Sequence, residues 1–168
     1  MKHITADKVL ETLDRHQAAG CHVDTRLLQQ VRAPGDMYLL TLPDATAFLS
    51  LIWQSINQAR PLVPVGQPRT LRDCAARLAG FGWHFQTLVD EGYPWFSKCL
   101  AIDAAFDRSK FGWLALTPPY VSEQKETPQG THYVYDGVHK SIVLAKRLIR
   151  REIEYASVEA LLLTPRRS

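Results

Sequence analysis

The chain has 168 residues, of which 46% are hydrophobic and 22% charged, and its net charge is +3. These values are typical of a globular protein with a substantial core, and they exclude a disordered, collagen-like or disulfide-dense chain. The polar segment 1–17, and the lack of any apolar run long enough to span a membrane, predict a cytoplasmic protein that is not inserted into a bilayer. The three widely spaced cysteines favour reduced thiols in that compartment.

Apolar residues at helical spacing dominate the segment 1–59. The pattern predicts, in order, a helix over 6–18, a short helix after Asp24, a buried strand over 37–42 and a long helix from Pro43-Asp44 to about Ala59.

Prolines and glycines divide the segment 60–100. The proline-containing stretch 60–68 is expected to be extended, with little helix. Thr70 and Asp73 have the spacing of a capping box, which predicts a helix that Gly80 and Gly82 end. Residues 83–100 are aromatic and β-prone. The aromatic side chains of this stretch could stack on bases, but at this density they favour a core; they are Trp83, Phe85, Tyr93, Trp95 and Phe96.

Strands alternate with helices in the remainder of the chain. The pattern predicts strands over 113–116 and 132–135, a polar surface loop over 122–131, a helix over 141–149, and a strand or short helix over 158–164. We therefore expect a single α+β domain over residues 1–168, with a small mixed sheet and flanking helices. Residues 1–95 either cover this sheet or bind a partner.

One segment, Asp136-Gly137-Val138-His139-Lys140-Ser141, joins a predicted strand to a predicted helix. A helix start exposes unpaired N–H groups and the positive end of the helix dipole, so it binds phosphate readily. Gly137 allows the backbone to approach an anion, Lys140 adds a positive charge and Ser141 adds a hydroxyl. Asp136 is placed either to cap the helix or to hold a metal ion, and a purely structural turn is the alternative for the whole segment.

This segment, followed by the small residue Ala145, resembles the signature of the ParB/sulfiredoxin superfamily, a Gly-x-x-Arg or Gly-x-His-Arg turn before a helix. The resemblance covers residues 100–165, including the Pro-containing stretch 115–121 and the final predicted strand. It implies a ParB/sulfiredoxin-like fold for this part, and binding of nucleotide phosphates by Gly137, Val138, His139, Lys140 and Ser141.

Two departures from the family pattern limit the reactions that the resemblance implies. Val138 stands where sulfiredoxins carry the catalytic cysteine, which argues against sulfinic acid reduction. Lys140 replaces the usual arginine and offers a point charge without the bidentate fork. Our first hypothesis is a phosphohydrolase, an ATPase and/or DNase, that binds ATP or CTP with Mg²⁺. In it Lys140 stabilises developing phosphate charge, Asp136 places the metal and His139 transfers a proton.

Asp136 is the preferred Mg²⁺ ligand because of its position beside the turn. Other acids could serve instead, but each is more ordinary as a surface residue: Asp103, Asp107, Glu123 and Glu126.

Size, and the lack of a recognisable DNA-reading helix-turn-helix, resemble one branch of the superfamily, the plasmid fertility-inhibition (Osa-like) group. Members of this group are associated with ATPase and DNase activity and inhibit conjugative DNA transfer. The resemblance thus implies a secretion or conjugation component as a partner.

Two other hypotheses stay open. The segment 140–168 holds seven basic and three acidic residues, whereas the segment 1–139 has a net charge of −1. A basic helix face could therefore bind DNA phosphates in a non-catalytic nucleic-acid- or protein-binding module, although a solvated face is favoured on charge pattern alone. That face comprises Lys146, Arg147, Arg150 and Arg151. The third hypothesis is a small-molecule kinase.

Overall fold

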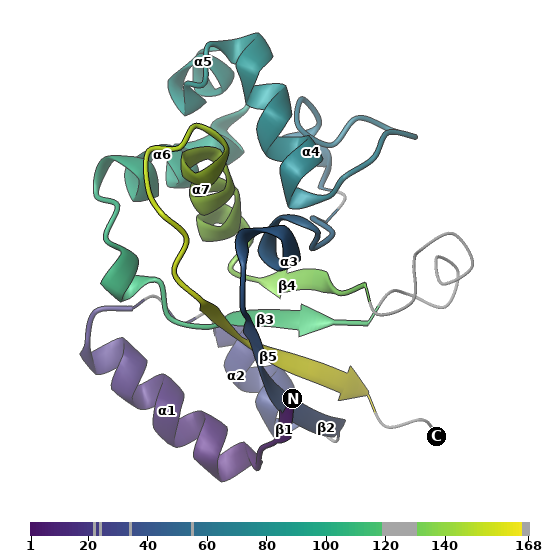
Figure 1. The fold of residues 1–168 in the computed structure, drawn as a ribbon, viewed down its shortest axis with the longest axis vertical. Coiled ribbons are helices and arrows are strands. Elements are labelled where there is room, and N and C mark those ends of the chain that lie inside the picture. Colours follow the sequence, from purple (N-terminus) through teal and green to yellow (C-terminus); the bar gives the residue numbers. More distant parts are fainter. Residues whose placement is uncertain (22, 24, 34, 55, 119–130, 166–168) are drawn as a thin grey trace.

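Among the described residues, a mixed sheet of five strands organises the fold in the computed structural model (Figure 1). The strands are β1 (Lys2–His3), β2 (Gly35–Leu42), β3 (Leu114–Thr117), β4 (Tyr133–Asp136) and β5 (Val158–Pro165). They lie in the order β1-β2-β5-β3-β4, with β3 and β5 parallel and the other neighbours antiparallel. The structure describes all residues except 22, 24, 34, 55, 119–130 and 166–168. The loop expected over 122–131 therefore falls outside the described residues, except for residue 131.

Helices cover both faces of this sheet, which confirms the predicted α+β class with flanking helices (Figure 1). One face carries α1 (Ala6–Ala18) and α2 (Thr25–Arg32). The other carries α3 (Ala45–Leu49), α4 (Leu71–Ala76), α5 (Phe85–Asp90), α6 (Ser97–Ala104) and α7 (Val138–Ile149). Short 3-10 helices lie between them: η1 (Asn57–Ala59), η2 (Arg77–Phe81), η3 (Pro94–Phe96) and η4 (Arg108–Lys110). In the described part of the chain, no helix has the length and apolar character needed to cross a bilayer.

Side chains of the central strands alternate between two hydrophobic cores. In β5, Leu161 and Leu163 pack with α1 and α2, while Ala160 and Leu162 join the larger core on the opposite face. This two-residue period is that of a strand covered on both faces, and it requires apolar residues at successive positions. Helix α7 is buried over residues 142–145 and lies at the centre of the larger core.

Several local predictions are confirmed by the structure. Helix α1 spans the predicted residues, and the final segment is a strand. The capping box at α4 is present: Thr70 Oγ1 accepts a hydrogen bond from the Asp73 N–H at 3.1 Å, and the Asp73 carboxylate accepts one from the Thr70 N–H at 3.2 Å. Helix α7 begins at Val138, earlier than the apolar pattern from Ser141 onward predicts.

The long helix predicted from residue 44 to about residue 59 is wrong. Helix α3 ends at Leu49, and the chain then runs along the outer side of β4. The Ile52 N–H donates to His132 O, and the Val134 N–H donates to Ile52 O, both at 3.0 Å. The edge of the sheet thus satisfies the backbone groups that a helix would have paired internally.

The β-prone segment 83–100 contains no strand and instead carries the short helices α5 and η3 and the start of α6. Their aromatic residues have β propensity, but burial decides the local structure here. Phe85 and Phe96 lie in the larger core with rings 6.3 Å apart, as the core interpretation of the aromatic cluster predicts. Trp83 adopts a positive φ of 65°, which is incompatible with a regular strand.

A buried ionic cluster joins α6 to α7. The Asp103 carboxylate accepts hydrogen bonds from the ammonium of Lys146 and from Nε of Arg147, the latter at 2.9 Å. The side chain of Lys146 is only 8% exposed, and its ammonium also lies 5.2 Å from the centre of the Phe85 ring. Burial of this cation therefore depends on the single carboxylate of Asp103.

Replacing Asp103 with Ala is expected to lower the free energy of unfolding by about 3–5 kcal/mol, because a buried cation loses its partner. Urea denaturation measures this loss. Glu11→Ala is the matched control, since it breaks an ion pair with Lys8 on the exposed surface of α1 and should leave the midpoint nearly unchanged. Equal midpoints for the two variants would contradict the assigned role of Asp103.

Candidate functional site

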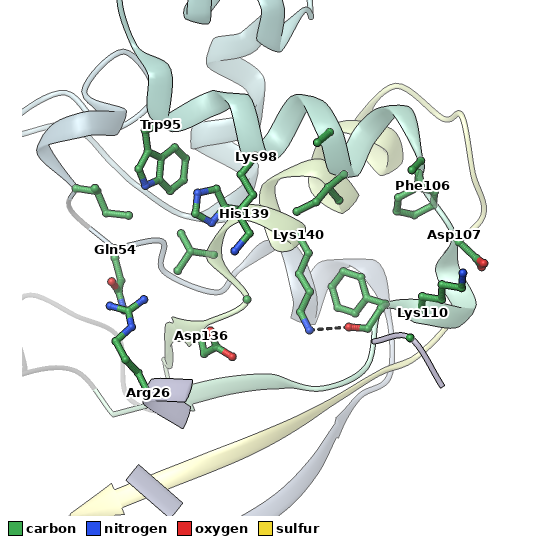
Figure 2. A pocket seen from close by; sticks show the side chains of 18 residues that line it. Arg26, Gln54, Trp95, Lys98, Phe106, Asp107, Lys110, Asp136, His139 and Lys140 are labelled. Atoms are coloured by element: carbon green, nitrogen blue, oxygen red, sulfur yellow. Dashed lines mark hydrogen bonds between the residues drawn. The ribbon is translucent and has the colours of Figure 1, made fainter. Parts of the chain in front are cut away.

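A cavity of about 590 Å³ opens at the start of α7, within the size range of small-molecule sites (Figure 2). It is lined by the turn of residues 136–140 and by residues of α2, α6 and η4. The aromatic side chains Trp95, Phe106 and Phe111 also line it. The structure therefore brings the predicted turn together with segments that are distant in the sequence.

Gly137 gives the turn its shape. It is the N-cap residue of α7 and has the left-handed φ of 83°, which glycine adopts at low cost. A Cβ atom there would lie 2.6 Å from Leu114 Cδ2 and 2.7 Å from Lys140 Cε. Gly137 is the N-cap, and no side chain of the described residues caps α7, so the alternative in which Asp136 caps the helix is wrong.

Four of the five predicted phosphate-binding residues line the cavity: Gly137, Val138, His139 and Lys140. The N–H groups of residues 138–140 belong to the first helical turn, where no intrahelical carbonyl is available to them. The side chain of Ser141 is fully buried outside the cavity lining, and its hydroxyl donates to Val138 O at 2.8 Å. Ser141 thus stabilises the turn from the protein interior and not from the cavity.

Neighbouring side chains hold this turn in place. Trp53 Nε1 donates to Val138 O at 3.1 Å, and Gln54 Nε2 donates to Tyr135 O at 3.1 Å. Both residues follow α3, in the segment for which the apolar pattern predicts a helix. Non-helical backbone at residues 51–54 therefore supplies the support of the site.

The imidazole of His139 stacks on the indole of Trp95, with ring centres 4.0 Å apart and planes 22° apart (Figure 2). The indole of Trp95 also meets Trp53 edge-on, at 5.5 Å. Trp95 is half-buried and lines the cavity, so it belongs to the site as well as to the aromatic core.

The ammonium of Lys140 is held by main-chain carbonyls. It donates to Phe111 O at 2.6 Å and to Trp113 O at 2.7 Å, and it lies 4.9 Å from the centre of the Phe111 ring. Burial lowers the pKa of Lys140 to about 8, against the smaller opposing effect of the Asp136 carboxylate.

Exposed cations lie around the cavity: Arg26 from α2, Lys98 from α6 and Lys110 from η4 (Figure 2). The carboxylates in the described lining are those of Asp107 and Asp136. Together with Lys140, the basic residues outnumber the acidic ones two to one, so the cavity favours an anionic ligand.

Apolar side chains make up much of the rest of the lining. One face of α6 contributes Ala101 and Ile102, and Ala105 and Phe106 follow at the end of this helix. Phe111, Ile56 and Val138 complete the apolar lining. An anionic ligand with a flat apolar group could therefore place its charge at the turn and that group against α6.

The described residues contain no group of three or more metal-ligating side chains. Mg²⁺, however, usually binds one or two carboxylates together with phosphate oxygens and water, so Asp136 in the cavity wall fits the expected mode. Asp107 also lines the cavity, and hydrogen bonds from Ser109 hold its pKa below the ordinary value. Asp103 is engaged by Lys146 and Arg147, and Glu123 and Glu126 lie outside the described residues.

The four residues predicted to bind nucleic acid lie outside the described cavity lining: Lys146, Arg147, Arg150 and Arg151. Lys146 and Arg147 bind Asp103, and Arg150 pairs with Glu152 at 3.1 Å. Arg151 is exposed and has a positive φ of 56°. Carboxylates thus already engage three of these four charges, while their role in nucleic-acid binding stays a prediction.

Sequence reasoning named Asp107 as a possible Mg²⁺ ligand but missed most of the part of the site that comes from the segment 1–110. Arg26, Gln54, Lys98 and Lys110 lie far from the turn in sequence, and no motif links them to it. The aromatic pattern around Trp95 indicates a core residue and gives no sign of a cavity. Only the tertiary fold brings these side chains, which come from separate elements, to one cavity at the start of α7.

Comparisons with models of known protein families, with curated proteins and with solved structures find no match.

Gly137→Ala is expected to destabilise the fold by more than the roughly 1–2 kcal/mol that a left-handed residue costs, because its Cβ would also collide with Leu114. Gly66→Ala is the control, since Gly66 also has a positive φ, of 71°, and a Cβ added there would meet nothing within 4 Å. Thermal denaturation of both variants measures their losses of stability, and the difference between the two losses is the contribution of the steric collision. Equal losses would show that the close approach at Gly137 contributes nothing.

Proposed function

We propose that the chain binds a nucleoside triphosphate in this cavity and hydrolyses a phosphate bond. The observation that carries the proposal is the composition of the cavity. The cavity begins at the first turn of α7, has cations around it, and has apolar and aromatic side chains from α6 and its neighbouring segments in its lining. Phosphates favour a helix start with nearby cations, and a base favours a flat apolar surface.

A single nucleotide is favoured over a DNA strand as the ligand. A volume of about 590 Å³ suits a ligand of nucleotide size. Sequence-independent DNA binding would need an open row of cations. In the basic helix, Asp103 and Glu152 instead engage Lys146, Arg147 and Arg150.

The chemistry proposed for the turn assigns one role to each polar group. The N–H groups at the start of α7 and the ammonium of Lys140 would stabilise negative charge that develops on the transferred phosphoryl group. Asp136 would hold Mg²⁺, which supplies charge neutralisation to the phosphates when bound. His139, oriented by its stacking on Trp95, would transfer a proton.

The ParB/sulfiredoxin-like assignment belongs to the same proposal. It is supported by the succession of β4, the Gly137 turn, α7 and β5, and by the position of Val138, His139 and Lys140 in the cavity lining. Inhibition of conjugative DNA transfer, a conjugation component as partner and a cytoplasmic location rest on the resemblance and the composition, and they stay predictions.

Titration with ATP and CTP, with and without Mg²⁺, tests the proposal when binding heat and phosphate release are both followed. Lys98→Ala and Lys110→Ala should each weaken binding about tenfold, through loss of a charged hydrogen bond to phosphate. Lys2→Ala is the control, because Lys2 is an exposed cation on β1 outside the cavity lining. If neither ATP nor CTP binds, or if all three variants lose the same affinity, the proposal is contradicted.

A further inference from the structure

Lys140 occupies an unusual position for a cation that faces a ligand cavity. An ammonium has three N–H donors, and Lys140 directs two of them to Phe111 O and Trp113 O. Its side chain passes against Gly137, at a position where a Cβ would lie 2.7 Å from Lys140 Cε. The main chain thus holds the ammonium in the cavity wall, and the third N–H group takes no part in these two hydrogen bonds.

This ammonium has no carboxylate partner within 4 Å among the described residues. Charged and titratable groups face it from several elements: Asp136 of β4, His16 of α1, Cys21 before α2, Lys98 of α6 and Arg108 of η4. Asp136 and Cys21 raise the pKa of Lys140, whereas Arg108 and Lys98 lower it, and burial outweighs them all. The free cavity therefore holds a cation that main-chain carbonyls bind but that no carboxylate of the described residues neutralises within 4 Å.

An anion in the cavity would supply the missing compensation. Lys140 lines the same cavity as the first turn of α7, and its Cε passes 2.7 Å from a Cβ position at Gly137, so a phosphate bound at that turn would be close to the ammonium. Interaction with an anion favours the charged form of a lysine, and by linkage the charged form favours the anion.

We propose that a phosphate-bearing ligand and a proton bind to this cavity together, and that Lys140 is the group that accepts the proton. The inference rests on the proposed function, because it needs an anionic ligand at the turn. It assigns Lys140 a role that differs from those of Lys98 and Lys110, which are exposed and contribute charge without this coupling.

The size of the coupling follows from the pKa of about 8 for Lys140 in the free protein. If the bound state restores an ordinary lysine pKa, binding at pH 9 takes up about 0.9 of a proton, against about 0.2 at pH 7.5. The affinity then falls about eightfold between these two pH values. The direction is a loss of affinity with rising pH, because the deprotonated amine binds the anion less well.

Calorimetric titration with ATP in the absence of Mg²⁺ measures this uptake when it is repeated in buffers of different ionisation enthalpy. At pH 7.5 and 9 the terminal phosphate of ATP is largely ionised, so proton uptake comes from the protein. Lys140→Arg is the decisive variant, because arginine keeps its charge at both pH values. It should bind ATP with no uptake at pH 9 and with a nearly constant affinity. Lys110→Ala is the matched control, which should weaken binding and keep the uptake.

Uptake near one proton at pH 9 in the natural protein, and its loss in Lys140→Arg, would support the inference. ATP binding without uptake, or unchanged uptake in Lys140→Arg, would overturn it and leave the proposed function standing. If Lys140→Arg does not fold, ¹⁵N resonances of the lysine side chains decide the question. A lysine Nζ group with a pKa near 8, which ATP raises by one unit or more, supports the inference. If the spectra contain no group with these properties, the inference is overturned. Lack of ATP binding at both pH values overturns the proposed function and this inference together.

Discussion

The candidate site depends on the close approach of the Gly137 backbone to Leu114 and Lys140. A left-handed residue without a side chain lets β4 turn directly into α7, so the first helical turn faces the cavity. The same approach lets the side chain of Lys140 reach the carbonyls of Phe111 and Trp113. One glycine therefore sets both the direction of the helix start and the position of a buried cation, and these two features make the cavity attractive to an anion.

Local chemistry explains which parts of the fold could be predicted. The capping residues Thr70 and Asp73 belong to the same helical turn, and the apolar pattern of residues 6–18 marks one helix face, so both predictions are confirmed. Residues 50–59 carry apolar residues compatible with a helix. Their backbone at Ile52 instead pairs with β4, which comes much later in the sequence, and no local pattern contains that information.

The candidate site likewise combines a part that neighbouring residues determine with a part that contacts between distant segments determine. The turn at Gly137 could be found from sequence because its residues are consecutive, whereas the cations Arg26, Lys98 and Lys110 come from three separate elements. Net charge is a poor guide to exposed charge, because Asp103 engages Lys146 and Arg147 of the basic helix. The excess of positive charge near the carboxyl end thus belongs in part to an internal cluster that joins two helices, and the accessible cations of the cavity lie elsewhere.

The chain segment along the outer side of β4 has a consequence for association between molecules. An unpaired edge strand offers N–H and C=O groups on which another chain can add, which leads to aggregation or to assembly. Ile52 already pairs with β4, so this edge, beside the cavity, is protected. At the opposite edge β1 contributes only Lys2 and His3 alongside the longer β2. Growth of the sheet by an added strand is therefore directed to the side away from the cavity, where it would leave the opening to ligand unobstructed.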